Sequence, residues 1–165
     1  MTINESTKKA RDIVTSYDGP KLRIMEVCGT HTHEIFRLGI RRLLPDSIEL
    51  ISGPGCPVCV TPVSYIDEAV MLALDKKATI TTFGDLIRVP GTEMSLAGAR
   101  SKGAKVSVVY SPLDSLEYAK EHLDEQVVFL AVGFETTTPG SVMAVREAKA
   151  QGIENFSILT ANKTM

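Results

Sequence analysis

The sequence predicts an α/β protein in which parallel sheets are flanked by helices, because short apolar runs alternate with amphipathic stretches. The apolar runs are nearly continuous in aliphatic and β-branched residues, which is typical of strands covered on both faces. Strands that alternate with helices pair in parallel through right-handed crossovers. We therefore expect Rossmann-like three-layer lobes with strands at residues 22–27, 48–52, 78–82, 105–110, 126–132 and 156–160.

Proline and glycine punctuate the stretches between these strands. Thr61-Pro62 and Thr138-Pro139 are typical helix starts, with a hydroxyl N-cap followed by proline at the first helical position. Pro45, Gly103 and Gly152 are typical of positions just beyond a helix end. We expect helices at residues 1–20, 33–44 and 92–102, from 61 onwards, and at 138–150.

The domain organisation follows from chain length and from the spacing of the strands. A chain of 165 residues fits one ordinary domain or two small lobes that share an interface. We place the boundary within residues 98–104, so that 21–103 form a first α/β lobe and 104–165 a second. The strand at 156–160 has no covering helix after it, which indicates that the second lobe is incomplete.

Composition excludes several classes of function. Hydrophobic residues make up 44% and charged residues 23%, as in water-soluble globular proteins. The net charge is −2, aromatic residues are 5%, and no basic stripe is present, so the sequence predicts no nucleic-acid binding. No apolar run is long enough to span a bilayer, and the N-terminus lacks the apolar stretch of a signal peptide. We therefore expect a cytoplasmic protein without a membrane partner.

The three cysteines, Cys28, Cys56 and Cys59, all fall in the first 60 residues. In a cytosolic chain, such clustering indicates thiol or metal chemistry rather than a disulfide framework. Ligands of open α/β sheets bind at the carboxyl ends of the strands. Both cysteine segments follow predicted strands, so we expect them at such an edge.

The first segment, Cys28-Gly29-Thr30-His31-Thr32-His33, places a thiol and two imidazoles within six residues at the start of a helix. The helix dipole and the free N–H groups there favour a thiolate. Thiolate and imidazole together suit a transition metal such as Fe(II) or Zn(II). The alternative is a small packed cysteine beside helix-capping polar residues.

The second segment, Gly53-Pro54-Gly55-Cys56-Pro57-Val58-Cys59, contains a Cys-x-x-Cys motif between a strand and a helix. Its two thiols can close a redox-active disulfide ring or ligate one metal ion. The glycines and prolines permit a tight backbone path around the thiols. Structural zinc is an alternative, because three cysteines and two histidines offer enough ligands for a four-coordinate site.

A third unusual segment, Gly133-Phe134-Glu135-Thr136-Thr137-Thr138-Pro139, follows the predicted strand at 126–132. Glu135 is a candidate proton acceptor, a hydrogen-bond partner for a ligated thiol, or a polar clamp on a bound group. The alternative is that the threonines cap the next helix while Glu135 is solvated.

Together, residues 25–33, 53–62 and 133–137 closely resemble the signature segments of the HypD family of NiFe-hydrogenase maturation factors. The three segments occur in the same order as in that family, and each follows a predicted strand. The resemblance covers the chain from about residue 7 to its end.

This resemblance implies a scaffold that binds iron and supports assembly of the Fe(CN)2CO group together with a HypC-type chaperone, while HypE and HypF deliver cyanide. It implies that Cys28 is the iron-binding thiol, with His31 as a second metal ligand and Thr30 and His33 beside the bound group. It also implies that Cys56 and Cys59 are the redox-active pair, and that Glu135 lines the same cleft between two similar lobes.

One feature of the family is missing from this chain. Family members are longer and end in a cysteine-rich region that holds a 4Fe-4S cluster, whereas this sequence has no cysteine after Cys59. Two other functions stay open on the residues alone. One is a Cys-x-x-Cys dithiol–disulfide oxidoreductase, and the other is a zinc-stabilised or nucleotide-binding α/β module.

Overall fold

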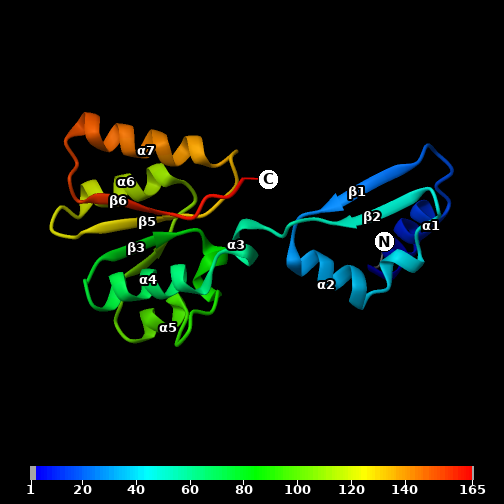
Figure 1. Cartoon of the computed structure of the whole chain (residues 1–165), viewed down its shortest axis with the longest axis horizontal. Helices are drawn as coiled ribbons and strands as arrows, with labels where there is room; N and C mark the ends of the chain where they lie inside the picture. Colours follow the sequence, from blue (N-terminus) through cyan, green and yellow to red (C-terminus); the bar gives the residue numbers. More distant parts are fainter. Residues whose placement is uncertain (1–2, 165) are drawn as a thin grey trace. The chain divides into compact units, whose positions relative to one another are not determined.

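The computed structural model describes residues 3–164, and it divides the chain into two compact units, Met1–Cys59 and Val60–Met165 (Figure 1). Both units have α/β architecture with parallel strands, as the alternation of apolar and amphipathic segments predicts. The expected fold class is therefore confirmed. No helix within residues 3–164 is long and apolar enough to cross a membrane.

The Met1–Cys59 unit is built on two parallel strands. Its elements are α1 (Ile3–Thr15), β1 (Leu22–Glu26), α2 (Gly29–Arg37), the 3₁₀ helix η1 (Ile40–Arg42), β2 (Ile48–Ser52) and most of α3 (Pro57–Val60). The register runs from Leu22 opposite Ile48 to Glu26 opposite Ser52. Both strands therefore end at the same edge, where the cysteine segments begin.

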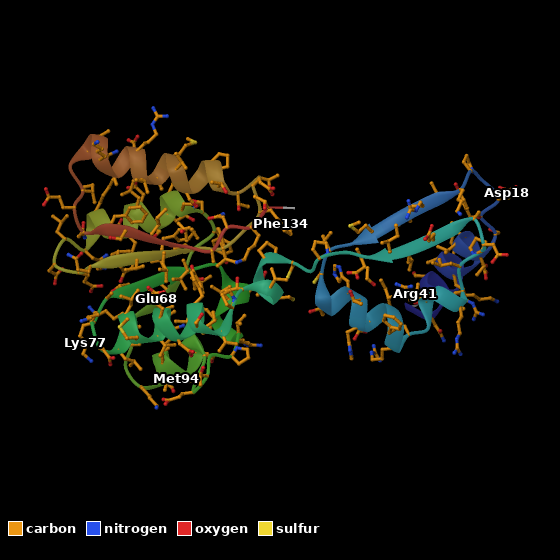
Figure 2. All side chains as sticks on the ribbon, viewed as in Figure 1. Asp18, Arg41, Glu68, Lys77, Met94 and Phe134 are labelled. Atoms are coloured by element: carbon orange, nitrogen blue, oxygen red, sulfur yellow. The ribbon has the colours of Figure 1, made fainter. Side chains whose placement is uncertain are left out.

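This unit contains no fully buried side chain among residues 4–59. Figure 2 shows side chains projecting from both faces of the two-stranded ribbon. Met25 of β1 is 53% exposed, and Phe36 of α2 is 64% exposed. Local contacts replace a core here. The Arg41 guanidinium, for example, lies 5.2 Å from the Phe36 ring centroid and donates to Ser52 Oγ at 3.2 Å.

The Val60–Met165 unit is a three-layer α/β fold. It contains α4 (Val63–Leu74), β3 (Thr79–Thr82), the 3₁₀ helix η2 (Gly84–Arg88), α5 (Leu96–Ser101), β4 (Val106–Val108), α6 (Pro112–Glu121), β5 (Val127–Ala131), α7 (Thr138–Gln151) and β6 (Phe156–Thr160). The four strands are parallel in the order β4-β3-β5-β6. Helices α6 and α7 cover one face, and α4 and α5 cover the other (Figure 1).

The core of this unit lies on both faces of its sheet. Phe129 of β5 is fully buried, and its ring meets Phe83 edge-on at a centroid distance of 5.4 Å. Leu116 of α6 and Ala144 of α7 pack in the same cluster. Ile66 of α4 is also fully buried. These side chains hold the helices against the strands.

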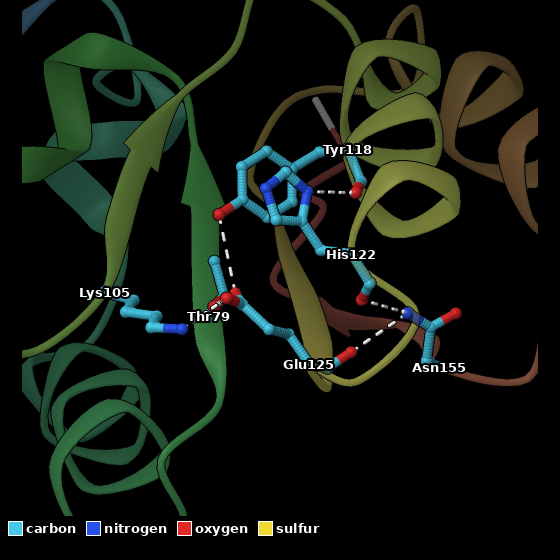
Figure 3. Close-up of polar contacts among 6 residues, drawn as sticks. All are labelled: Thr79, Lys105, Tyr118, His122, Glu125 and Asn155. Carbon is cyan, nitrogen blue, oxygen red and sulfur yellow. Dashed lines mark hydrogen bonds and ion pairs between the residues drawn. The ribbon is translucent and has the colours of Figure 1, made fainter.

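A buried amide fixes the turn that leads into β5 (Figure 3). The Asn155 side chain donates to the carbonyls of Ala119, His122 and Glu125 at 2.9, 3.0 and 2.9 Å. The Asn155 carbonyl also accepts from the amide of Val127, the first residue of β5, at 2.8 Å. One residue thus connects the end of α6, the turn and the strand.

The Glu125 carboxylate extends this network to the start of β3 (Figure 3). It accepts from Lys105 Nζ and from Thr79 Oγ1. Lys105 first, and then Thr79, hold the pKa of Glu125 below its ordinary value. The carboxylate therefore joins the first residue of β3 to the segments that precede β4 and β5.

The division between units differs from the expected boundary within residues 98–104. Strand β3 pairs with β4 on one side and β5 on the other, so residues 60–103 belong with the carboxyl-terminal unit. Apolar periodicity identifies strands, but it carries no information about which strand pairs with which.

Two helices of the Met1–Cys59 unit differ from the expected ones in their limits. The helix expected at 33–44 begins at Gly29 and ends at Arg37, and Gly39 with a φ of 62° separates it from η1. The helix expected at 1–20 spans Ile3–Thr15, and residues 1–2 lie outside the described part.

Three helix starts in the other unit are shifted by a few residues. Helix α5 starts at Leu96 rather than at 92, because Ser95 is its N-cap. The N-cap of α4 is Pro62 rather than Thr61, and that of α7 is Thr137 rather than Thr138. Threonine followed by proline thus locates a helix start to within one residue here.

Candidate metal and thiol site

Cys28 lies at the N-cap of α2, two residues after β1 ends. Its backbone is extended, with φ −134° and ψ 124°, and its carbonyl accepts from Thr32 N at 3.0 Å, which starts the helix. The thiol makes no capping hydrogen bond of ordinary geometry. The amides of His31 first, and then Thr30, nevertheless hold the pKa of the Cys28 thiol below its ordinary value. The helix start thus favours thiolate at Cys28, as expected.

The Cys-x-x-Cys motif follows β2 through a tight turn. Gly55 has a φ of 93°, a conformation that residues with a Cβ rarely adopt. Cys56 Sγ donates to Cys59 Sγ at 3.2 Å and accepts from the Cys59 amide at 3.4 Å. Burial first, and then the Cys59 side chain, raise the pKa of Cys56 above its ordinary value, although the Cys59 amide opposes them. The pKa values of these two neighbouring thiols are therefore shifted in opposite directions, that of Cys28 downwards and that of Cys56 upwards.

The parallel pairing of β1 and β2 brings all three thiols together. The Sγ atoms of Cys28, Cys56 and Cys59 lie within 4.8 Å of one another, and the three cysteines are free. A tetrahedral metal with bonds of about 2.3 Å to sulfur separates its sulfur ligands by about 3.8 Å. Small side-chain rotations would bring the three sulfurs to that spacing. The cluster can therefore hold a thiophilic metal ion or exchange two thiols for a disulfide.

The histidines of the first segment lie on α2 beside this cluster but are not members of it. His31 and His33 are exposed, and neither imidazole belongs to the group of potential ligand atoms that the three thiols form within the described residues. Thr30 is also exposed and lies in the first turn of α2. The structure therefore brings the three predicted cysteines together and leaves both imidazoles open to solvent.

Glu26 is a site residue that the sequence analysis did not single out. Its carboxylate accepts from the Cys28 amide at 3.1 Å and from the Thr32 hydroxyl. The Thr32 hydroxyl first, and then the Cys28 amide, lower the pKa of Glu26, while partial burial opposes them. A carboxylate beside a helix start favours such contacts, because the first N–H groups of a helix lack backbone partners. The pattern Glu-x-Cys-x-x-x-Thr could have revealed this contact.

Glu135 belongs to the Val60–Met165 unit, and its surroundings are described within that unit alone. It is exposed, and its carbonyl accepts from Thr138 N at 3.3 Å as the chain turns into α7. Thr137 Oγ1 donates to the Phe134 carbonyl at 2.8 Å. A Cβ at Gly133 would collide with the Thr137 side chain, so the turn has room only for glycine while Thr137 stays in place. The threonines thus shape the helix start, and a role for Glu135 stays a prediction.

Comparison with known proteins identifies the family of this chain. Residues 2–165 match the model of the HypD family, which is described as "Hydrogenase formation hypA family". The hydrogenase maturation factor HypD of Cupriavidus necator is 50% identical over 142 residues, which cover 86% of this chain and 38% of that protein. The Escherichia coli protein of the same name is 48% identical over 144 residues, covering 87% and 39%.

A relative from Methanocaldococcus jannaschii matches to a similar extent. This putative hydrogenase expression/formation protein is 46% identical over 143 residues, which cover 87% of this chain and 40% of that protein. The chain therefore spans about two fifths of the length of these relatives. Because the family model covers the described fold and all three cysteines, this chain belongs to the HypD family of hydrogenase maturation factors.

Proposed function

We propose that the three-thiol cluster of this hydrogenase maturation protein binds iron and supports assembly of the Fe(CN)2CO group. The observation that carries the proposal is the meeting of three free thiols, within 4.8 Å of one another, at the carboxyl edge of β1 and β2. Thiolates are suitable ligands for iron, and membership of a hydrogenase maturation family supplies the context for that chemistry.

The three thiols have different tasks in this proposal. Cys28 is the iron-binding thiol, because the helix start favours its thiolate form. Cys56 and Cys59 are the redox pair, since their sulfurs lie 3.2 Å apart. When the two S–H groups form one S–S bond, they release two electrons and two protons. Those electrons are available to the iron group during its assembly.

The remaining predicted residues complete the proposed site. We assign His31 as a second iron ligand, with Thr30 and His33 beside the bound group, and we propose Glu135 as a proton acceptor in the assembly reaction. The proposed partners are a HypC-type chaperone and the cyanide-delivering proteins HypE and HypF. Longer family members are expected to carry a 4Fe-4S cluster, whose ligands are absent from this chain, since no cysteine follows Cys59. A cytoplasmic location would keep the thiols reduced.

A second candidate function is that of a general dithiol oxidoreductase. The short distance between the sulfurs of Cys56 and Cys59 favours it. Turnover in an insulin-reduction assay, unchanged in Cys28→Ala, would support this function. Tightly bound zinc without thiol reactivity would instead support a zinc-stabilised module.

The test is an anaerobic infrared spectrum of the 165-residue chain purified together with its HypC-type partner. We expect metal-cyanide and metal-carbonyl bands from the wild-type complex and none from Cys28→Ala. Ser47→Ala is the matched control, because it trims a side chain of similar size directly before β2, at the end of the strand away from the cysteines, and it should keep the bands. Bands that persist in Cys28→Ala would exclude Cys28 as the essential ligand.

A further inference from the structure

Glu26 contacts the Cys28 segment through its side chain. One carboxylate oxygen accepts from the Cys28 amide at 3.1 Å, and the other accepts from the Thr32 hydroxyl one turn further along α2. The two contacts span the first turn of the helix. They fix the turn from which the Cys28 thiol projects.

The same residue contacts the second cysteine segment through its backbone. The Glu26 carbonyl accepts from the Gly53 amide at 2.8 Å, directly after the last rung of the β1–β2 pairing. A Cβ at Gly53 would lie 2.5 Å from that carbonyl oxygen, so only glycine allows the close approach. Gly53 opens the turn that leads to Cys56 and Cys59. Glu26 therefore joins both cysteine segments.

Hydrogen bonds, rather than the packing of buried side chains, hold the two cysteine segments in place. Residues 4–59 contain no fully buried side chain, and Cys28 itself makes no ordinary capping hydrogen bond. The bond from the Cys28 amide to Glu26 holds Cys28 at the N-cap of α2. Loss of the carboxylate would leave the Cys28 amide without this partner and loosen the turn.

We propose that Glu26 is the positioning residue of the thiol cluster, holding Cys28 Sγ within reach of Cys56 and Cys59 so that the three can bind one divalent metal ion. This inference rests on the proposed function of the cluster as a metal-binding site. Groups that orient metal ligands typically contribute about 10- to 100-fold to metal affinity. Glu26 acts through Cys28 and makes no contact with the metal ion itself.

The experiment is an anaerobic titration of the 165-residue chain with Co²⁺, followed by thiolate-to-cobalt charge-transfer absorption. Glu26→Ala should weaken Co²⁺ binding at least about tenfold. Glu26→Gln should bind nearly as tightly as wild type, because its amide oxygen still accepts from the Cys28 amide and its NH2 group can donate to the Thr32 hydroxyl, which then donates to the Cys28 carbonyl. Glu49→Ala is the matched control. It removes a strand glutamate that pairs with Arg23 in the same unit, and it should leave Co²⁺ binding unchanged.

Further measurements and a milder variant distinguish a loss of positioning from a loss of folding. Circular dichroism should show the same secondary structure in all variants. The rate at which iodoacetamide alkylates Cys28, measured by mass spectrometry, should change in Glu26→Ala and return to the wild-type rate in Glu26→Gln. If Glu26→Ala does not fold, Thr32→Val provides the test. It removes one of the two anchors, and it should weaken Co²⁺ binding severalfold.

Two results would overturn the inference. Unchanged Co²⁺ binding in both Glu26→Ala and Thr32→Val would show that the cluster needs no such positioning. A folded Glu26→Gln variant as weak as Glu26→Ala would assign the effect to charge rather than to hydrogen bonding.

A third variant separates this inference from the proposed function on which it rests. Cys28→Ala that binds Co²⁺ like wild type would overturn both, because the cluster would then not be the metal site. Lost binding in Cys28→Ala together with unchanged binding in Glu26→Ala would overturn the positioning role alone.

Discussion

Every fully buried side chain of the described residues belongs to the Val60–Met165 unit, whereas all three cysteines belong to Met1–Cys59. The carboxyl-terminal unit has four paired strands with helices on both faces. The amino-terminal unit has two paired strands, and a sheet of that size is marginally stable in water. The two units thus stabilise their structures by different means.

The difference shows how a thiol site can be kept in place without a core. Hydrophobic burial stabilises a fold without regard to direction, whereas hydrogen bonds and tight turns fix individual groups. In Met1–Cys59 the cysteines are placed by the hydrogen bonds of Glu26, by the close approach of Gly53 to the Glu26 carbonyl, and by the positive φ of Gly55. Changes to the core of one unit should therefore affect stability, and changes to the polar contacts of the other should affect thiol chemistry.

The largest expected effect is a loss of stability on a change in the apolar core of the Val60–Met165 unit. Phe129→Ala should lower the free energy of unfolding of the Val60–Met165 unit by about 3–5 kcal/mol, because it empties a fully buried ring site. Phe36→Ala is the matched change in the other unit, where the ring is 64% exposed, and it should cost less than about 1 kcal/mol. Hydrogen exchange of β5 amides under native conditions measures the first effect. Equal costs for the two variants would contradict the comparison.

The second largest expected effect concerns the buried hydrogen bonds of Asn155 in the Val60–Met165 unit. Asn155→Ala should destabilise the Val60–Met165 unit by about 2 kcal/mol, because three carbonyls lose a buried donor. Denaturant unfolding measures the change. Gln126→Ala, which removes a nearby exposed amide, should be nearly neutral. A neutral Asn155→Ala would mean that water replaces the side chain at no cost.

The third prediction concerns Gly53→Ala, which should affect both the stability of the Met1–Cys59 unit and the placement of its thiols. Gly53→Ala should lower the free energy of unfolding by about 1.5 kcal/mol, because its Cβ would collide with the Glu26 carbonyl. It should also alter the alkylation rates of Cys56 and Cys59, measured by mass spectrometry.

Gly39→Ala is the control for this change. It strains a residue with a φ of 62° in open space, and it should cost about 1 kcal/mol while leaving the thiol rates unchanged. Unchanged thiol rates in Gly53→Ala would show that the close approach does not position the motif.

The sequence predicted the part of this architecture that depends on local pattern. The strands expected at 48–52 and 156–160 match β2 and β6, because their apolar residues are bounded by turn residues on both sides. The rule that ligands bind at the carboxyl ends of parallel strands placed both cysteine segments at a sheet edge. The meeting of Cys28 with the Cys-x-x-Cys motif depends in addition on the pairing of β1 with β2, which the structure supplies.

The features that the sequence did not predict depend on long-range contacts. The boundary between units depends on the pairing of β3 with β5, which no local pattern encodes. The role of Glu26 depends on the path of the backbone at the strand end, where a carboxylate looks like any solvated residue in the sequence. The sequence placed His31 and Cys28 within one motif, but it could not show which groups face the thiols.

The smallest expected effect concerns an exposed polar contact of the Val60–Met165 unit. Thr92 donates to both carboxylate oxygens of Asp67, through its hydroxyl at 2.6 Å and its amide at 2.7 Å. The hydroxyl first, and then the amide, lower the pKa of that carboxyl below its ordinary value of 3.8. A carboxyl whose pKa is lower in the folded protein contributes stability above its unfolded pKa and loses it as pH falls through the folded pKa.

The melting temperatures of wild type and Asp67→Asn should therefore differ at neutral pH and converge as the pH falls below 3.8. Thr92→Val should show the same convergence from a smaller difference, because it removes the hydroxyl donor and keeps the amide. Thermal melts at a series of pH values measure both. Melting curves that stay equally far apart at every pH would contradict a role for the Asp67 charge, and the stability of this unit would then depend on its apolar core and on buried hydrogen bonds such as those of Asn155.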